Sequence, residues 1–321
     1  MPNRSRPLAG SLAAGVLLVC AACGGDDPLA ESDSGTDTGS AEDKGSLSLS
    51  GQNFTEMQIM AELYGQLLED AGYTVESRLV ATRDVYLGGL QDGSIDVVPE
   101  YAGSIADELN ARANGPNAEP ASTPDIESTM ANLRELAAEV GLEALEPAEA
   151  TDENAFAVTQ DYADEQSLTT LTDLGELGEP VKLAAAEDCS ERPDCAIGLE
   201  RVYDIAIDPP VLPLGFGTQE TKNALIDGEV QLGQAGTSDG SLEELGLVLL
   251  EDDQNLQAAQ NLVPVVNAET LQANPDIADT LNQLSSELTT EDLADMNAAV
   301  DLDRQKPEDV AQQFLEDAGL I

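Results

Sequence analysis

The sequence contains no histidine and no tryptophan, and it has only 13 lysine and arginine residues against 63 aspartates and glutamates. Without histidine the chain cannot build the Ser/His or Cys/His dyads of nucleophilic enzymes, and no glycine-rich phosphate loop follows a predicted strand. A net charge of −50 repels the phosphate backbone and argues against nucleic acid as a partner. We therefore expect a binding protein, not an enzyme, and no cofactor.

Cysteine is also scarce, with four in the chain. The first two close an N-terminal segment in which arginines precede an apolar stretch over residues 8–19, a pattern typical of a secretory leader with a lipoprotein cleavage site. A stretch of about a dozen apolar residues is shorter than the roughly twenty that a transmembrane anchor needs. We predict a signal peptide over residues 1–22, lipidation of Cys23, and a disordered tether over residues 23–45, where Ser, Asp, Thr and Gly predominate.

The remaining cysteines are Cys189 and Cys195, since Cys20 would leave with the leader and Cys23 would carry lipid. In the oxidising setting of an exported protein they can form one local disulfide, which would contribute roughly 2 kcal/mol of stability. The chain has no histidine and no second cysteine pair to complete a zinc site. The spacing also differs from that of a redox pair, so we predict a structural disulfide and no metal.

The acidic residues are spread over every predicted helix, and lysine occurs only four times. We favour adaptation of the surface to high salt, where screening with a Debye length of about 3 Å at 1 M relieves self-repulsion. The alternative is electrostatic steering of cationic ligands toward a binding site.

Strand and helix patterns alternate through most of the chain, which predicts an α/β architecture with mostly parallel sheets. Short apolar runs predict strands at 47–49, 74–81, 95–98, 155–158, 181–185, 230–232, 247–250 and 263–266. Helical spacing occurs over 56–71, 83–92, 125–140, 170–176, 196–204 and 218–227, and helices alone follow at 275–287, 290–299 and 307–318.

Two motifs lie where strands are predicted to end. The run Gln-Asn-Phe-Thr-Glu over 52–56 follows the first strand and opens a helix, with Thr55 as the expected N-cap. The second is Pro-Glu-Tyr-Ala-Gly-Ser, in which Pro99 should end the strand before it because proline lacks a backbone donor. Tyr101 and Ser104 would then lie in the following turn.

Together these motifs resemble those of the substrate-binding proteins of osmoprotectant ABC transporters, which capture glycine betaine, choline, carnitine and similar quaternary amines. Further matches make the resemblance cover residues 46–321, and they lie at 152–158, 168–174, 198–203, 237–240 and 250–253. The resemblance implies a two-lobed periplasmic-binding-protein-like fold of type II with the solute between the lobes. Lobe 1 would comprise residues 46–151 plus 262–321, and lobe 2 residues 152–261.

The resemblance also implies site residues. A quaternary ammonium has a charge but no N–H donors, so aromatic faces hold it, whereas a carboxylate needs arginine, amide or hydroxyl donors. Tyr101 and Phe156 match aromatic positions of the family. Gln52, Ser104 and Arg192 match positions that reach the carboxylate of the solute. Phe156 could instead be a core residue, and Arg192 could pair with a neighbouring acid.

Two positions depart from the family pattern. Gly236 stands where an aromatic residue usually precedes the Thr-Ser-Asp run, and Gln260 stands where tyrosine is common. The loss of two rings at about 1 to 2 kcal/mol each would weaken binding about thirty- to a thousandfold. Gln260, Asn261 and Thr237 are the candidates to supply hydrogen bonds instead.

The predicted function is capture of an osmoprotectant of the glycine betaine, choline or carnitine class by lobe closure. The implied partners are an ABC permease with its cytoplasmic ATPase, and the protein would be a lipid-anchored monomer on the extracytoplasmic face of the cell membrane. Two alternatives stay open: the same transport role for a more polar, non-quaternary solute, and a surface lipoprotein with an adhesive or structural role.

Overall fold

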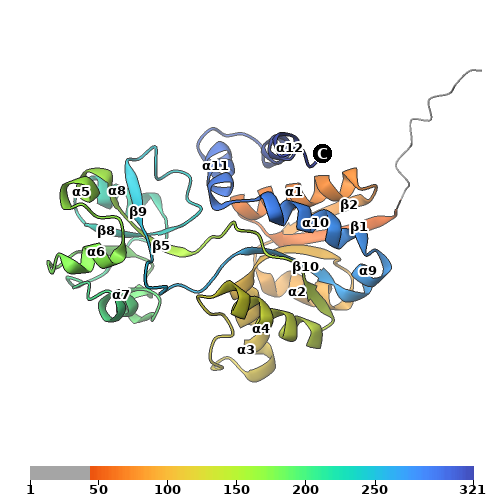
Figure 1. Ribbon diagram of the computed structural model, residues 1–321, viewed down its shortest axis with the longest axis horizontal. Helices are drawn as coiled ribbons and strands as arrows, with labels where there is room; N and C mark the ends of the chain where they lie inside the picture. The colour runs from red at the N-terminus through yellow and green to blue at the C-terminus, as the bar shows by residue number, and fades with distance from the viewer. Residues whose placement is uncertain (1–43) are drawn as a thin grey trace, which may run out of the picture. The chain divides into compact units, whose positions relative to one another are not determined.

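The structure is a computed structural model of the chain and describes residues 44–321, which form two five-stranded sheets with helices around each (Figure 1). The predictions for the leader, for Cys23 and for most of the tether lie outside the described residues. Within residues 44–321, none of the helices combines the length and apolar character that a membrane crossing needs.

The first sheet has the strand order β2-β1-β3-β10-β4. Its strands are β1 (Ser46–Gln52), β2 (Thr74–Val80), β3 (Val97–Tyr101), β4 (Leu142–Ala144) and β10 (Leu262–Asn267). Side chains alternate between its faces: Val97 belongs to the core under one face and Val98 to the core under the other. The sheet is therefore covered on both sides.

Helices of the first sheet divide between these two cores. On one face lie α1 (Thr55–Asp70), α10 (Asp276–Glu287), α11 (Thr290–Asp301) and α12 (Pro307–Asp317), and on the other α2 (Arg83–Asp92), α3 (Ala102–Asn114) and α4 (Ile126–Glu139). The short α9 (Ala268–Ala273) follows β10. Helix α1 contacts the sheet as well as α10, α11 and α12, so apolar residues surround most of it, including Ile59, Leu63 and Leu67.

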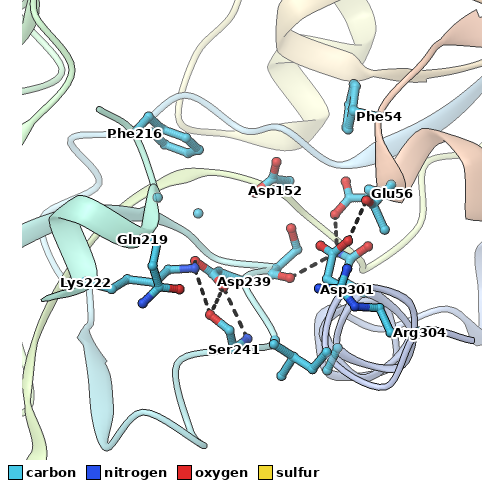
Figure 2. A pocket seen from close by; sticks show the side chains of 18 residues that line it. Phe54, Glu56, Asp152, Phe216, Gln219, Lys222, Asp239, Ser241, Asp301 and Arg304 are labelled. Carbon is cyan, nitrogen blue, oxygen red and sulfur yellow. Dashed lines mark hydrogen bonds and ion pairs between the residues drawn. The ribbon is translucent and has the colours of Figure 1, made fainter. Parts of the chain in front are cut away.

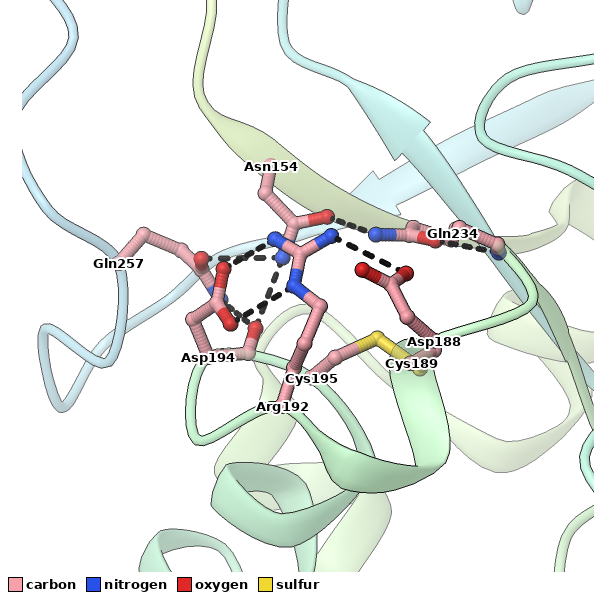
Figure 3. Close-up of a disulfide and its surroundings, with 9 residues drawn as sticks. Asn154, Asp188, Cys189, Arg192, Asp194, Cys195, Gln234 and Gln257 are labelled. Atoms are coloured by element: carbon pink, nitrogen blue, oxygen red, sulfur yellow. Dashed lines mark hydrogen bonds and ion pairs between the residues drawn. A yellow bond between two sulfur atoms is a disulfide. The ribbon is translucent and has the colours of Figure 1, made fainter. Parts of the chain in front are cut away.

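The second sheet has the order β7-β6-β8-β5-β9. Its strands are β5 (Asn154–Thr159), β6 (Leu183–Ala185), β7 (Leu212–Pro213), β8 (Leu232–Gly236) and β9 (Leu247–Leu250). Its helices are α5 (Gln160–Gln166), α6 (Leu171–Glu176), α7 (Ala196–Val202) and α8 (Gln219–Ile226), with a 3₁₀ turn, η1 (Cys189–Glu191). A disulfide joins Cys189 to Cys195 beside α7, and both cysteines are buried in the core of this sheet (Figure 3).

The chain crosses between the sheets twice, over residues 145–153 and 251–261. An antiparallel bridge between Thr151 and Asn261 ties the two crossing segments together. The strands that follow the crossings, β5 and β10, enter their sheets from the side at which the parallel strands end. They therefore run antiparallel to their neighbours. Because β10 and β5 each lie between two strands of the opposite direction, four of the five strands in each sheet run the same way, and the expectation of mostly parallel sheets is confirmed.

The prediction that Pro99 ends a strand was wrong. Strand β3 continues through Pro99 to Tyr101, and Pro99 lies opposite Pro264 of β10. In an antiparallel pair of strands, residue pairs that exchange backbone hydrogen bonds alternate with pairs that do not. The Ala102 N–H donates to the Asn261 carbonyl, which makes Pro99 and Pro264 a pair of the second kind. The ladder between β3 and β10 therefore needs no backbone donor from either proline. As a result Tyr101 is a strand residue and Ser104 lies in the first turn of α3.

Thr55 is the first residue of α1 and not its N-cap, which is Phe54. The Thr55 hydroxyl donates instead to Asp301 of α11, at 2.7 Å. Sequence patterns also missed α3, and they missed the short elements α5, α9, β4 and β7.

Candidate functional site

A cleft of about 530 Å³ lies among elements from both sheets and the first crossing segment (Figure 2). One wall comes from the turn between β1 and α1 and from the C-terminal end of α11. The other comes from the loop before α8, from α8 itself and from the loop after β8. Asp152 of the first crossing segment also lines it.

Two carboxylates stand close together in this cleft. Glu56 is only 4% exposed. It accepts hydrogen bonds from the Tyr101 hydroxyl and, at 2.7 Å, from Nδ2 of Asn297. Burial, followed by the negative charge of Asp152, raises the pKa of Glu56 to about 7. Burial also raises the pKa of Asp152, against the hydrogen bonds that it accepts from Ser238.

Two phenylalanines line the cleft and are exposed, Phe54 at 39% and Phe216 at 45%. In the view of Figure 2 their rings lie on either side of Asp152. Phe216 stands between Gly215 and Gly217, whose φ angles of 103° and 59° place both in the left-handed region that favours glycine. The backbone of this loop therefore holds a large apolar ring where solvent and a ligand can reach it.

Gly236 leaves room for that ring. A Cβ atom on Gly236 would lie 3.4 Å from Cζ of Phe216 and 2.5 Å from Oδ1 of Asp152. The aromatic side chain that the family pattern puts at this position would therefore collide with Asp152. In this chain a ring from a different loop lies over the same spot.

The lining contains four carboxylates and two basic residues: Glu56, Asp152, Asp239 and Asp301, against Lys222 and Arg304. Lys222 Nζ lies 2.6 Å from Oδ2 of Asp239 and 2.7 Å from the Ser241 hydroxyl, so its charge is already paired. The cleft therefore presents an excess of negative charge.

Three of the predicted site residues come together behind the cleft. Tyr101 is 8% exposed and donates its hydroxyl to Glu56. The backbone N–H and the hydroxyl of Ser104 both donate to Oε1 of Gln260, each at 3.0 Å. Gln260 is joined to the lining because its carbonyl accepts from the Asp152 N–H at 3.3 Å. Gln52 ends β1 two residues before Phe54 and is half-buried.

None of the seven predicted residues is part of the cleft lining, and the other three make contacts elsewhere. Phe156 is fully buried in the core of the second sheet, which fits its alternative interpretation as a core residue. Arg192 donates to Asp194 and lies 3.8 Å from Asp188, beside the disulfide (Figure 3). Thr237 donates to the Thr151 carbonyl at 2.9 Å and thereby ties the end of β8 to the first crossing segment.

Sequence reasoning did not select Phe54, Glu56, Asp152 or Phe216, although all four line the cleft. Phe54 and Glu56 lie inside the first motif, and Asp152 begins one of the further matching segments. Phe216 carried a local signal, because it is one of only four phenylalanines and stands between two glycines.

Two sheets joined by two crossing segments, with a cleft lined from both sides, are the architecture of an extracytoplasmic solute-binding protein. Residues 45–317 match the family described as the substrate binding domain of ABC-type glycine betaine transport systems, and the chain belongs to this family. The family and the fold class predicted from the sequence are thus confirmed. Members of the family bind solutes for transporters and are not enzymes.

Curated relatives and a solved structure agree with this assignment. The glycine-betaine-binding protein of Pseudomonas aeruginosa PAO1 is 25% identical over 288 residues, which are 86% of this chain and 88% of that protein. Glycine betaine-binding protein YehZ of Escherichia coli K12 is 28% identical over 278 residues, 83% of this chain and 88% of YehZ. The solved apo structure of YehZ matches with a TM-score of 0.72 at 26% identity, covering 86% of this chain and 99% of YehZ.

Proposed function

We propose that this chain is the solute-binding component of an ABC importer and that the cleft lined by Phe54 and Phe216 binds a quaternary amine of the glycine betaine, choline or carnitine class. The observation that carries the proposal is the pair of exposed phenylalanine rings in a cleft that also holds Glu56 and Asp152. Desolvated cation–π contacts contribute about 0.5 to 2 kcal/mol per ring. A carboxylate adds charge attraction that needs no N–H donor on the solute.

The proposed site uses some of the residues that the family resemblance implies and replaces others. Tyr101 holds the Glu56 carboxylate through its hydroxyl, and Ser104 and Gln260 brace the crossing segment that carries Asp152. Phe216 takes the place of the ring absent at Gly236. We expect Tyr101, Ser104 and Gln260 to position the groups that bind the solute more than to touch it.

The proposed mechanism is closure of two lobes around the solute. Lobe 1 is residues 46–151 plus 262–321, lobe 2 is residues 152–261, and the crossing segments act as the hinge. A solute that contacts both walls of the cleft favours the closed state in proportion to its differential affinity for it. The closed protein would deliver its solute to a permease coupled to a cytoplasmic ATPase, with a lipid on Cys23 holding it at the outer face of the cell membrane.

A thermal-shift screen tests the proposed function. Choline, glycine betaine, carnitine and proline betaine are added at equal concentrations, and at least one of them should raise the melting temperature. A ligand at one hundred times its Kd stabilises the folded state by about 2.7 kcal/mol.

The matched variants remove exposed apolar side chains in and away from the cleft. The double substitution of Phe54→Ala and Phe216→Ala should abolish the shift. Val85→Ala, which truncates a side chain that is 64% exposed on α2, should leave it intact. A wild-type protein that responds to no quaternary amine, or responds only to polar solutes without a quaternary nitrogen, contradicts the proposal.

A further inference from the structure

The hydrogen-bond donors that a solute carboxylate would need are already engaged within the protein. Both donors of Ser104 go to Gln260. The Thr237 hydroxyl goes to the Thr151 carbonyl, and Arg192 is paired with Asp194 outside the cleft. Lys222 lines the cleft, but Asp239 and Ser241 hold its ammonium group. These donors are thus engaged in internal contacts.

Hydrogen-bond acceptors of the lining, by contrast, lack a cationic partner or lack a partner altogether. Glu56 and Asp152 lie side by side, and each is held by neutral donors and not by a cation. Among the buried side-chain nitrogen and oxygen atoms of residues 44–321, the one without a partner is Oδ1 of Asn297, which is an acceptor on the same wall. Asn297 is 8% exposed, and its Nδ2 already serves Glu56 and the Ser238 carbonyl.

Among residues 44–321, Arg304 is the basic residue that lines the cleft without forming an ion pair. Its side chain is exposed and therefore surrounded by water. Screening by salt and solvent makes such a charge a weak partner for a carboxylate. The neutral amides of Gln52 and Gln260 could serve a hydroxyl as well as a carboxylate, so they favour neither kind of solute.

We propose that this cleft selects a quaternary ammonium solute that carries no carboxylate, of which choline is the simplest, over zwitterions such as glycine betaine and carnitine. The inference rests on the proposed function, because it assumes that the cleft between Phe54 and Phe216 is the solute site. The trimethylammonium group lies between the rings with Asp152 as its counter-ion. The carboxylate of a betaine would lie close to Asp152 and Glu56, where like charges repel, and the exposed, solvent-screened Arg304 compensates this repulsion only weakly.

Isothermal titration calorimetry of the full chain with choline, glycine betaine and carnitine measures this preference directly. All three solutes carry the same trimethylammonium head, so differences in Kd report the remainder of the molecule. We expect choline to bind at least tenfold more tightly than either zwitterion. Glycine betaine that binds as tightly as choline, or more tightly, overturns the inference and leaves the proposed function standing. A protein that binds none of the three overturns the proposed function itself.

Asp152→Asn tests the residue held responsible. Removal of this charge should weaken choline binding at least tenfold and should weaken glycine betaine binding less, so the ratio of the two Kd values narrows. Asp70→Asn removes an exposed carboxylate at the end of α1, away from the cleft, and should leave both Kd values unchanged. Melting temperatures of the unliganded variants show whether each is folded. If folded Asp152→Asn keeps the wild-type ratio, the carboxylate does not set the preference and the inference fails.

Discussion

Arg83→Met should lower the free energy of unfolding by about 3 to 5 kcal/mol, because it leaves the buried carboxylate of Glu100 without a counter-ion. Glu100 is 1% exposed. It accepts from Nε and Nη2 of Arg83 at 2.7 and 2.8 Å, from the Tyr86 hydroxyl and from the Tyr101 N–H. Chemical denaturation followed by circular dichroism gives the free energies.

Arg78→Met is the matched control, since it makes the same substitution at an exposed position of β2 and should change stability by less than about 0.5 kcal/mol. Adding Glu100→Gln to Arg83→Met removes the uncompensated charge and should restore part of the loss. Equal stability of the Arg83 and Arg78 variants would show that the ion pair contributes nothing. Because Glu100 directly precedes Tyr101, this pair also fixes the strand end from which the Tyr101 hydroxyl reaches Glu56.

Glu56 should make the stability of the protein fall as the pH rises through neutrality. The pKa of this carboxyl is about 7 in the folded chain, against an ordinary value of 4.5. The folded state therefore binds the proton more tightly than the unfolded state, and stability is lost progressively between those two values. Relative to Glu56→Gln, the wild type should lose about 2 to 3 kcal/mol of unfolding free energy between pH 5 and pH 8.

The groups that face Glu56 come from every element around it: Tyr101 of β3, Asn297 of α11, Asp152 of the first crossing segment and Ser238 after β8. Denaturation curves at both pH values give the difference between wild type and variant, in which the titration of carboxylates that do not interact with Glu56 cancels. A constant difference between wild type and Glu56→Gln would mean that Glu56 ionises normally.

The fold was predictable because local patterns decide most of it. The helical spacing over residues 83–92 and the apolar run over residues 247–250 match α2 and β9. The direction of β5 and β10 was not predictable from periodicity, because it depends on which side of a sheet the chain enters after a crossing. The prediction at Pro99 failed for a related reason. Only the pairing of Pro99 with Pro264 shows that the sheet does not need a backbone N–H at this position.

The sequence motifs predicted which residues come together near the site, but not which groups their side chains contact. Tyr101, Ser104 and Gln260 do come together, but their polar groups face other protein groups. Gly236 indicated a lost ring, yet the sequence could not show that Phe216, twenty residues earlier in the chain, lies over it. The preference for a cation follows from which donors are already occupied, and that is a property of the folded chain alone.

The most direct test of a charge-recognising cleft compares choline with 3,3-dimethyl-1-butanol, in which a carbon replaces the quaternary nitrogen at almost the same shape. Calorimetric titration of the wild-type protein should show saturable binding of choline and at least tenfold weaker binding of the neutral alcohol, because only the cation gains from the Phe54 and Phe216 rings and from Asp152. Equal affinity for the two would show that the cleft recognises an apolar shape and would contradict its assignment as a quaternary ammonium site.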